Sequence, residues 1–374
     1  LFAVLSLTSS AQTKTLKIGD FIESTSYNED KRDAERTLQY YPDGQDFVCV
    51  NGKNRFTRAL YCNHSAYRIE TSDRPAFAIY KPKNYRSVRF HVIIDGKEMA
   101  LDSTDFCEAR YTAGKRTYKL TDKSWNNGQI IISVLPYSLS EGGIWVFSTA
   151  GFAREVQLKG LISEINNSKL RRNGDMGADP NGSFEAPVNP KQLQTFVWNA
   201  NGTTYVAADS TSLHVLTQKQ GEEEYTKSED ARNYLATRVT FDTPDPYINT
   251  LGGALTVAAD GIWDKKTSTW MHGAIGWRMP LAGWRAAYAG DVLGWNYRAI
   301  EHFNAYAASQ VTDVSCTISH PTQDTVQNMS RAVEKWGAPM YSNGYICRNP
   351  NNNKQMHHYD MNLNYMDELL WHFC

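Results

Sequence analysis

Residues 87–98 read SVRFHVIIDGKE and carry the pattern of an antiparallel β-hairpin. Apolar side chains occupy every second position from Val88 to Val92, as in a strand that buries one face. The pair Asp95-Gly96 that follows is typical of a two-residue hairpin turn. We therefore expect a strand, a tight turn and a second strand in this segment.

Short β-type runs of the same kind extend on both sides of this hairpin. They are AFAIY at 76–80, FCEARYT at 106–112, QIIISVL at 129–135, GIWVFST at 143–149 and REVQLKGLI at 154–162. The run TFVWNANGTTYVAAD, at 195–209, predicts one more hairpin with its turn at 199–202. Many short strands separated by turns predict an antiparallel β-sandwich, which we assign to residues 12–220.

Beyond residue 220 the pattern changes from strands to helices. The charged run EEEYTKSEDARNYLATRV predicts a linker helix within 221–241. The residues PYINTLGGALTVAAD begin an apolar helix, since aspartate and proline precede it in the positions that helix starts favour. Residues 291–308 predict another helix, capped by Asp291, and the final run HHYDMNLNYMDELLWHFC predicts one more.

The first twelve residues, LFAVLSLTSSAQ, are similar to the end of a secretory signal peptide. We assign residues 1–11 to a partial signal peptide and expect an exported protein, periplasmic or extracellular; the alternative is a buried N-terminal strand. The net charge of −1, with both signs spread along the chain, predicts no nucleic-acid partner. No later run is long and apolar enough to cross a bilayer, so we predict no membrane insertion.

Two features bear on metals and disulfides. The six cysteines lack the spacing of a zinc site, so we expect no metal and no cofactor, and the thiols either pair or stay buried. Asp175, Asp179, Asn181 and Glu185 lie close together in a Gly- and Pro-rich loop, which raises the possibility of calcium. Their spacing does not match an EF-hand, and we favour a solvated loop.

Residues 259–295 hold five of the ten tryptophans, interleaved with Asp, Arg and His. Glycines and a proline interrupt any helical pattern here, so we expect a loop. Flat apolar rings beside hydrogen-bonding groups suit the faces and hydroxyls of sugars; the alternative is that the rings pin the loop to the core. The candidate substrate-binding residues are Trp263, Trp270, His272, Trp277, Arg278, Trp284, Arg285, Tyr288 and Trp295.

Carboxyl groups near this loop are the candidates for catalysis, because glycoside hydrolysis takes a pair of them. The candidates are Asp260, Asp264 and Asp291. Asp291 has an alternative role as a helix cap. Glu301 lies two turns into the predicted helix, where a solvated or ion-paired side chain is the more common role.

The order of a β-sandwich, a linker helix and helices joined by aromatic loops resembles the six-hairpin (α/α)6 glycosidase superfamily. The phrases HGAIGWRMPLAGWRAAYAGDVLGWNYRA and HHYDMNLNYMDELLWHF resemble a family of secreted bacterial proteins known as domain of unknown function 4450. This resemblance covers residues 242–374 well. It covers the front domain only by architecture. It implies an α+β multidomain fold in which 242–374 begin an (α/α)6 barrel.

A barrel of twelve helices needs roughly 300 residues or more. We therefore expect a fragment truncated at both ends, inactive and unstable alone, with at least one catalytic carboxylate beyond residue 374. In glucoamylase-like relatives an adjacent Arg-Asp pair binds the sugar. This chain departs from that pattern, because Arg285 is six residues from Asp291.

Together these features predict a secreted glycoside hydrolase that breaks down an oligosaccharide or polysaccharide with paired carboxylates. A glycoside phosphorylase is one alternative, with Arg278, Arg285 and His272 available for phosphate. A non-catalytic carbohydrate-binding protein is another. A polysaccharide lyase would use Tyr288, His272 and Arg285.

Overall fold

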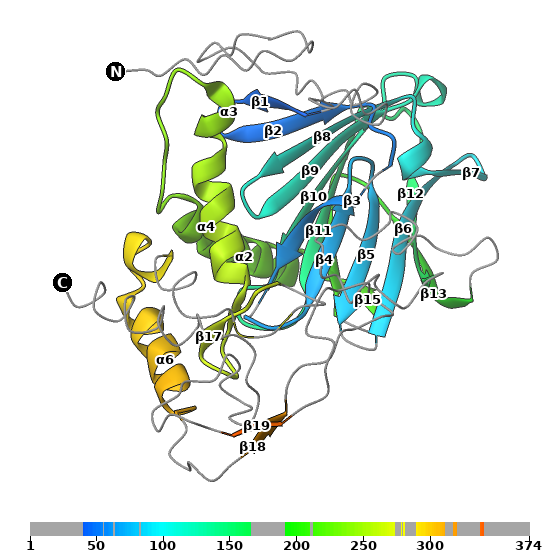
Figure 1. Ribbon diagram of the computed structural model, residues 1–374. Coiled ribbons are helices and arrows are strands. Elements are labelled where there is room, and N and C mark those ends of the chain that lie inside the picture. Colours follow the sequence, from blue (N-terminus) through cyan, green and yellow to red (C-terminus); the bar gives the residue numbers. More distant parts are fainter. Residues whose placement is uncertain are drawn as a thin grey trace, which may run out of the picture.

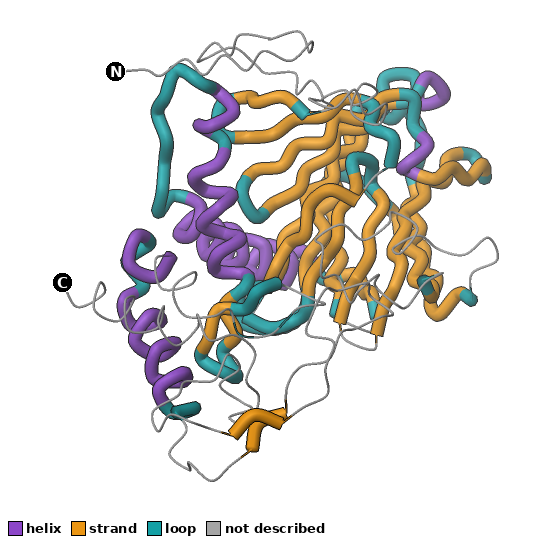
Figure 2. Tube along the Cα trace, in the orientation of Figure 1, coloured by secondary structure: helices purple, strands orange, loops and turns teal. Residues whose placement is uncertain are grey.

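The computed structural model describes residues 40–54, 56–62, 64–81, 84–165, 191–209, 212–273, 278, 280, 289–310, 317–319 and 337–339. Two large antiparallel sheets lie face to face in a sandwich, and helices cover one side of it (Figure 1). Along the chain the strands of the two large sheets come before the α-helices, as the colours of Figure 1 show, and Figure 2 shows these helices lying beside the sheets. This confirms the predicted antiparallel sandwich followed by helices.

The first sheet has eight strands, all paired antiparallel. In spatial order they are β1 (Tyr41–Asp43), β2 (Asp46–Val50), β8 (Phe106–Thr112), β9 (Lys115–Thr121), β10 (Gln129–Pro136), β11 (Gly143–Ala150), β14 (Thr203–Ala208) and β15 (Leu213–Val215).

The second sheet has seven strands and is also antiparallel. In spatial order they are β13 (Gln192–Asn199), β12 (Gln157–Glu164), β6 (Asn84–Ile94), β5 (Ala76–Lys81), β4 (Arg68–Ser72) and β3 (Phe56–Tyr61), with β7 (Lys97–Ala100) paired to β6. Short 3-10 turns lie at Leu101–Ser103 and Lys123–Trp125.

The hairpin predicted at 87–98 is confirmed as β6 and β7. Val88 and Val92 are buried, whereas His91 between them is partly exposed. Asp95 and Gly96 both have positive φ, 51° and 74°, which is the backbone of the turn that matches the twist of a two-residue hairpin. Ile94 therefore pairs directly with Lys97.

Aromatic rings from both sheets form the centre of the sandwich. Phe77 of the second sheet lies edge-on to Tyr118 and Trp145 of the first, with 5.6 Å between ring centroids in each pair. Phe90 and Phe147 meet across the same layer at 4.8 Å. These rings are buried, and such edge-to-face contacts add to the free energy gained by burying their surface.

The hairpin predicted at 195–209 is wrong. The two strands exist as β13 and β14, but β13 pairs with β12 while β14 pairs with β11, in the other sheet. The turn at 199–202 therefore crosses between the sheets. Close to this crossing, the partly buried ring of Trp198 packs against Phe147 of the other sheet, with 5.6 Å between the ring centroids.

Helices and small ladders follow the sandwich. They are α2 (Gln218–Ala236), α3 (Pro246–Asn249), α4 (Leu251–Gly261), β16 (Trp263–Asp264), β17 (Thr269–Trp270), α6 (Asn296–Ala307), β18 (Thr317–Ser319) and β19 (Gly337–Pro339). Thr217 caps α2 and forms a capping box with Gln220. Helix α2 lies against β14 and α4, so it is packed on the sandwich rather than extended from it.

The predicted helix at 291–308 begins later than expected. Helix α6 starts at Asn296, and its N-cap residue is Trp295, with no side-chain cap. Asp291 lies in a separate helical turn, and Gly294 at φ 68° ends that turn before α6 begins. The role of Asp291 as the cap of this helix is therefore corrected.

Other sequence predictions concern a barrel of helices, membrane insertion and three further segments. The described residues show a few helices after the sandwich and no barrel of helices. No helix within them is long and apolar enough to cross a membrane. The signal-peptide residues 1–11, the polar loop 175–185 and the helix predicted at 357–374 lie outside the described residues.

Three cysteines are described, and all of them are buried free thiols: Cys49, Cys62 and Cys107. The sequence left open whether the cysteines pair in disulfides or stay buried as thiols, and these three are buried thiols. Burial raises the pKa of the Cys62 and Cys107 thiols to about 12, so they stay protonated at neutral pH. The remaining cysteines, Cys316, Cys347 and Cys374, lie outside the described residues.

Candidate functional site

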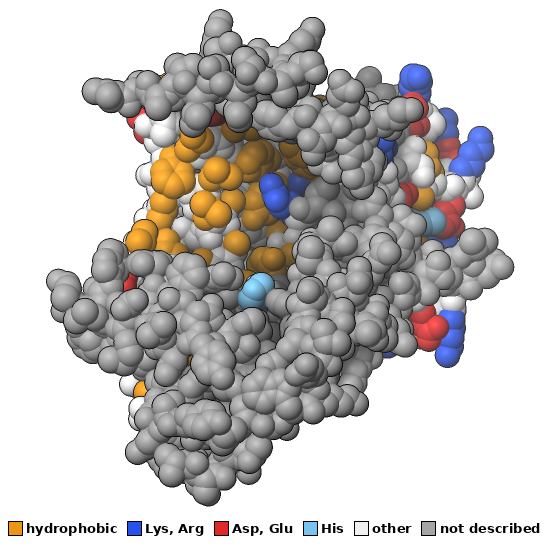
Figure 3. Space-filling view, in the orientation of Figure 1, with side chains coloured by type: hydrophobic (Ala, Val, Ile, Leu, Met, Phe, Trp, Pro, Cys, Tyr) orange, Lys and Arg blue, Asp and Glu red, His pale blue; other side chains and the backbone are white. Residues whose placement is uncertain are grey.

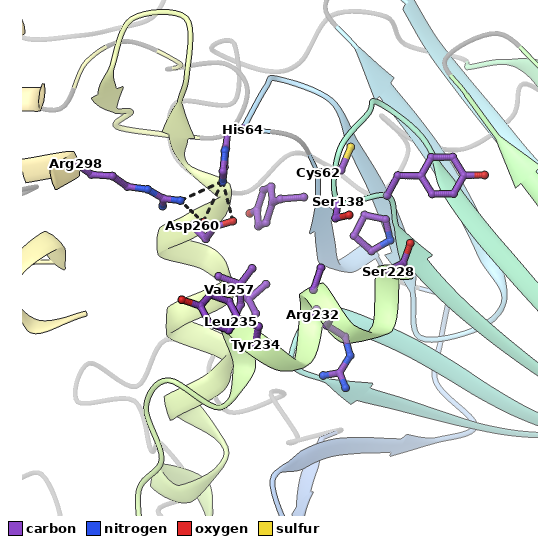
Figure 4. A pocket seen from close by; sticks show the side chains of 15 residues that line it. Cys62, His64, Ser138, Ser228, Arg232, Tyr234, Leu235, Val257, Asp260 and Arg298 are labelled. Atoms are coloured by element: carbon purple, nitrogen blue, oxygen red, sulfur yellow. Dashed lines mark hydrogen bonds and ion pairs between the residues drawn. The ribbon is translucent and has the colours of Figure 1, made fainter. Parts of the chain in front are cut away.

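A pocket of about 300 Å³ lies where the sandwich meets the helices. Residues after β3, the β8–β9 turn and the end of β10 form one side, and α2, α4 and α6 form the other (Figure 4). The lining residues are Tyr61, Cys62, His64, Gly114, Pro136, Tyr137, Ser138, Ser228, Ala231, Arg232, Tyr234, Leu235, Val257, Asp260 and Arg298.

Three of these residues, His64, Asp260 and Arg298, form a polar triad. The Nε2 atom of His64 lies 3.0 Å and 3.1 Å from the two carboxylate oxygens of Asp260. Arg298 Nη2 lies 2.8 Å from Asp260 Oδ1, on the other side of the carboxylate. Figure 4 shows the three side chains converging from the β3–β4 connection, α4 and α6.

The triad holds its carboxylate in the ionised form. Burial raises the pKa of Asp260, but the hydrogen bond and charge of His64, together with Arg298, outweigh it, and the pKa lies below its ordinary value. The side chains of Asp260 and Arg298 are 14% and 7% exposed, against 30% for His64. His64 is therefore the member of the triad that solvent or a ligand reaches most easily.

Backbone geometry fixes the position of His64. Its φ of 48° is in the left-handed region, which is uncommon for a residue other than glycine. The His64 carbonyl accepts a hydrogen bond from the backbone N–H of Lys265, at 3.4 Å, and one from Arg278 Nη2, at 3.3 Å. Arg278 is in turn held by Asp264, with Nη2 2.6 Å from Oδ1. The β16–β17 segment thus secures the loop that carries the imidazole.

Arg298 is held by aromatic rings. Its guanidinium carbon lies 4.4 Å from the centre of the Trp295 ring and 5.4 Å from that of Trp263. Such contacts stabilise a cation that is otherwise poorly solvated. The arrangement lets a buried arginine remain beside Asp260 with one fixed orientation.

The remaining walls combine apolar and hydroxyl groups. Leu235 and Val257 supply apolar surface, and Tyr61 and Tyr137 supply rings whose hydroxyl pKa is raised by burial. Ser228 is 2% exposed, and its hydroxyl has no hydrogen-bond partner in the described part of the chain. On the face shown in Figure 3, apolar side chains gather in a hollow over the region of α3, α4 and the neighbouring strands.

The structure separates the three predicted catalytic carboxylates. Asp260 lies in the pocket. Asp264 is 8% exposed and binds Arg278 and the Thr267 hydroxyl, at 2.8 Å, so its contacts are those of a residue that shapes the hairpin. Asp291 does not line the pocket.

The tryptophans described here pack within the core. Trp263, Trp270 and Trp295 are 4%, 1% and 4% exposed and form one cluster with Ala299. A ring with so little exposed surface has no free face for a sugar, so their position fits the alternative that they pin the loop to the core. His272 is exposed and does not line the pocket.

The structure does not describe four of the predicted substrate-binding residues. Trp277, Trp284, Arg285 and Tyr288 lie outside the described residues, and their role stays a prediction. In the described ranges, no group of three or more His, Cys, Asp or Glu side chains could hold a metal ion.

Sequence reasoning missed His64 and Arg298. His64 is 196 residues away from Asp260 and lies between two strands, where nothing in the local pattern marks it. Arg298 lies within a predicted amphipathic helix, in which an arginine is usually a solvated residue. A buried arginine between two tryptophans is visible only in three dimensions.

Comparison with known proteins gives a family match for part of the chain. A family model described as domain of unknown function (DUF4450) matches residues 82–229. This range runs from β6 to the first part of α2, whereas the resemblance was placed on 242–374, so that placement is corrected. The polar triad lies outside the matched residues. A comparison with curated proteins found no match.

Proposed function

We propose that this protein binds a saccharide in the pocket between the sandwich and the helices and takes part in glycan breakdown by glycoside hydrolysis. The observation that carries this proposal is the polar triad: an ionised carboxylate, an imidazole and a guanidinium meet in a pocket with aromatic and apolar walls. The proposal extends to an exported location, in keeping with the signal-like residues 1–11.

A saccharide fits the chemistry of these walls. Sugar hydroxyls both donate and accept hydrogen bonds, and the lining residues include Tyr61, Tyr137 and Ser138, which carry hydroxyl groups. Aliphatic and aromatic surface beside these groups suits the apolar face of a pyranose ring. The volume of about 300 Å³ is at the lower end of small-molecule sites, which suits a sugar unit better than a long segment.

Hydrolysis requires more than the described lining supplies. Asp260 is held ionised, so it cannot donate the proton that the leaving sugar needs. It is also the only carboxylate among the described residues that line the pocket. We place the second carboxyl group outside this lining, as in the six-hairpin (α/α)6 superfamily that the sequence resembles, where later barrel loops supply it.

The same observation favours a second candidate function, which is carbohydrate binding without hydrolysis. A single carboxylate that is already paired with a guanidinium and an imidazole can orient sugar hydroxyls without cleaving a bond. A phosphorylase gains no such support, because Arg278 and Arg298 each face an aspartate instead of an open phosphate site.

Product release from glycans tests the proposal. The complete natural protein is incubated with pectin, xylan, arabinogalactan and mucin, and released sugars are measured by anion-exchange chromatography. We expect a defined product from the wild type and from Asp230→Asn, an exposed control on α2, and none from Asp260→Asn. Retention of a glycan with no product, in water or in phosphate, would establish the binding function instead.

A further inference from the structure

We propose that His64 is the base that activates the attacking water, and that Asp260 acts through it as a positioning residue. This inference rests on the proposed hydrolysis and deepens it. It assigns the water-activating role to an imidazole that comes from the sandwich, rather than to a carboxylate of the Trp-rich loop.

The first argument is the proton position on His64. Both oxygens of Asp260 lie near Nε2, at 3.0 and 3.1 Å, and an ionised carboxylate can only accept hydrogen bonds. Nε2 must therefore carry the hydrogen. In a neutral imidazole the other nitrogen, Nδ1, is then an acceptor. It has no hydrogen-bond partner among the described residues, so its lone pair is available to a water molecule.

The second argument is the support around the imidazole. Asp260 from α4 and Arg298 from α6 face its Nε2 edge, with Arg298 Nη2 at 3.4 Å, and Arg278 holds its carbonyl. These are the charged groups that the described residues place against His64. Arg298 fixes the carboxylate, the carboxylate fixes the tautomer, and the hydrogen bonds to the His64 carbonyl hold the backbone that carries the ring.

The third argument is access. His64 is 30% exposed, about twice the value for Asp260 and four times that for Arg298. A base has to reach water, and the imidazole is the more exposed of the two groups, at 30% against 14%.

The proposed step balances as follows. His64 Nδ1 takes a proton from water, and the water oxygen forms a bond to the anomeric carbon. The bond between that carbon and the glycosidic oxygen breaks, and the leaving oxygen takes a proton from the second carboxyl group required above. The imidazolium is stabilised by Asp260 and then gives its proton to solvent.

Kinetics of variants test this role. His64→Gln should lower kcat by roughly 10²- to 10⁴-fold with little change in KM, the usual contribution of a general base. Asp260→Asn should lower kcat to a similar extent, because the amide can also donate to Nε2 and so favours the wrong tautomer. His214→Gln, at an exposed position on β15, should leave the rate unchanged. Added imidazole should partly restore His64→Ala.

The pH profile separates a base from a structural residue. The wild-type rate should rise with pH through the range in which imidazoles lose a proton. This limb should be absent in His64→Ala rescued by a saturating amount of an amine whose own pKa lies below that range, because such an amine is a neutral base throughout it. Rates within tenfold of the wild type in His64→Gln would overturn the inference, as would a profile that falls over this range.

The role of His64 and the proposed hydrolysis can be tested separately, because one measurement on His64 requires no turnover. Nitrogen-15 NMR of the imidazoles in the full chain should show His64 as the Nε2–H tautomer at neutral pH, and an Nδ1–H tautomer would overturn the inference. Equal cleavage of glycan by the wild type and by His64→Gln would reject only the role of His64. The proposed hydrolysis would then stand. Absence of any cleavage by the wild type would reject the hydrolysis, and the water-activating step with it.

Discussion

The ion pair between Asp260 and Arg298 should be strongly coupled in the folded protein. Their nitrogen and oxygen atoms are 2.8 Å apart, and the side chains are 14% and 7% exposed. Asp260→Ala leaves a buried guanidinium without its partner, which costs roughly 3–5 kcal/mol of unfolding free energy. Arg298→Ala leaves the carboxylate with His64 alone and also removes the contact with Trp295.

The double variant removes both charges, so its loss should be smaller than the sum of the two single losses. We expect a coupling energy of about 2 kcal/mol, within the range found for residues in direct contact. Urea unfolding of the four proteins, followed by tryptophan fluorescence, measures it. Lys219 and Glu223, an exposed pair on α2 at 3.9 Å, form the control cycle and should couple by roughly 0.3–0.5 kcal/mol. Additive losses at Asp260 and Arg298 would refute the buried pair.

Three further predictions concern stability. Because the pKa of Asp260 lies below its ordinary value of 3.8, its ionised form stabilises the fold above about pH 4, and this contribution is lost as pH falls through the lowered pKa. When the unfolding free energy is measured as the pH is lowered, it should therefore fall less steeply for Asp260→Asn than for the wild type. An equal dependence on pH in the two proteins would contradict the lowered pKa of Asp260. Trp270→Ala should cost about 3–5 kcal/mol in denaturant unfolding, since the ring is 1% exposed; a small loss would mean that the ring does not pin the loop. Thr217→Ala removes the cap of α2 and should lower the urea midpoint by an amount equal to about 1 kcal/mol, with no change in the dependence on urea; an unchanged midpoint would count against the capping box.

The sandwich could be predicted because its signal is local. Alternation from Val88 to Val92 and the turn at Asp95-Gly96 are read from neighbouring residues, and the structure confirms both. Which sheet a strand joins is not local. The turn at 199–202 has the composition of a hairpin, yet Trp198 packs into the core and the chain crosses to the other sheet.

The candidate site could be predicted in part. Asp260 belongs to a stretch whose composition is unusual, so the sequence alone singles it out. Its partners do not share that stretch. His64 comes from the sandwich, and tertiary packing brings it to α4 across 196 positions of sequence.

The tryptophans show the limit of composition as evidence. Aromatic residues with interleaved charges describe both a sugar site and a packed loop, and only burial separates the two. Trp263 and Trp295 enclose the guanidinium of Arg298, so they contribute to the pocket through the residue they hold rather than through their own faces. The spacing of tryptophans carries no information about this arrangement.

Retention of the full chain on immobilised or gel-embedded glycans tests the central claim that the pocket binds a saccharide. Ala231→Trp places a large ring on the α2 side of the pocket, and Thr226→Trp places the same ring on an exposed position of that helix. Across pectin, xylan, arabinogalactan and mucin, the wild type and Thr226→Trp should be retarded by the same glycan, and Ala231→Trp should migrate freely while remaining folded. Equal retardation of Ala231→Trp would show that the saccharide binds elsewhere.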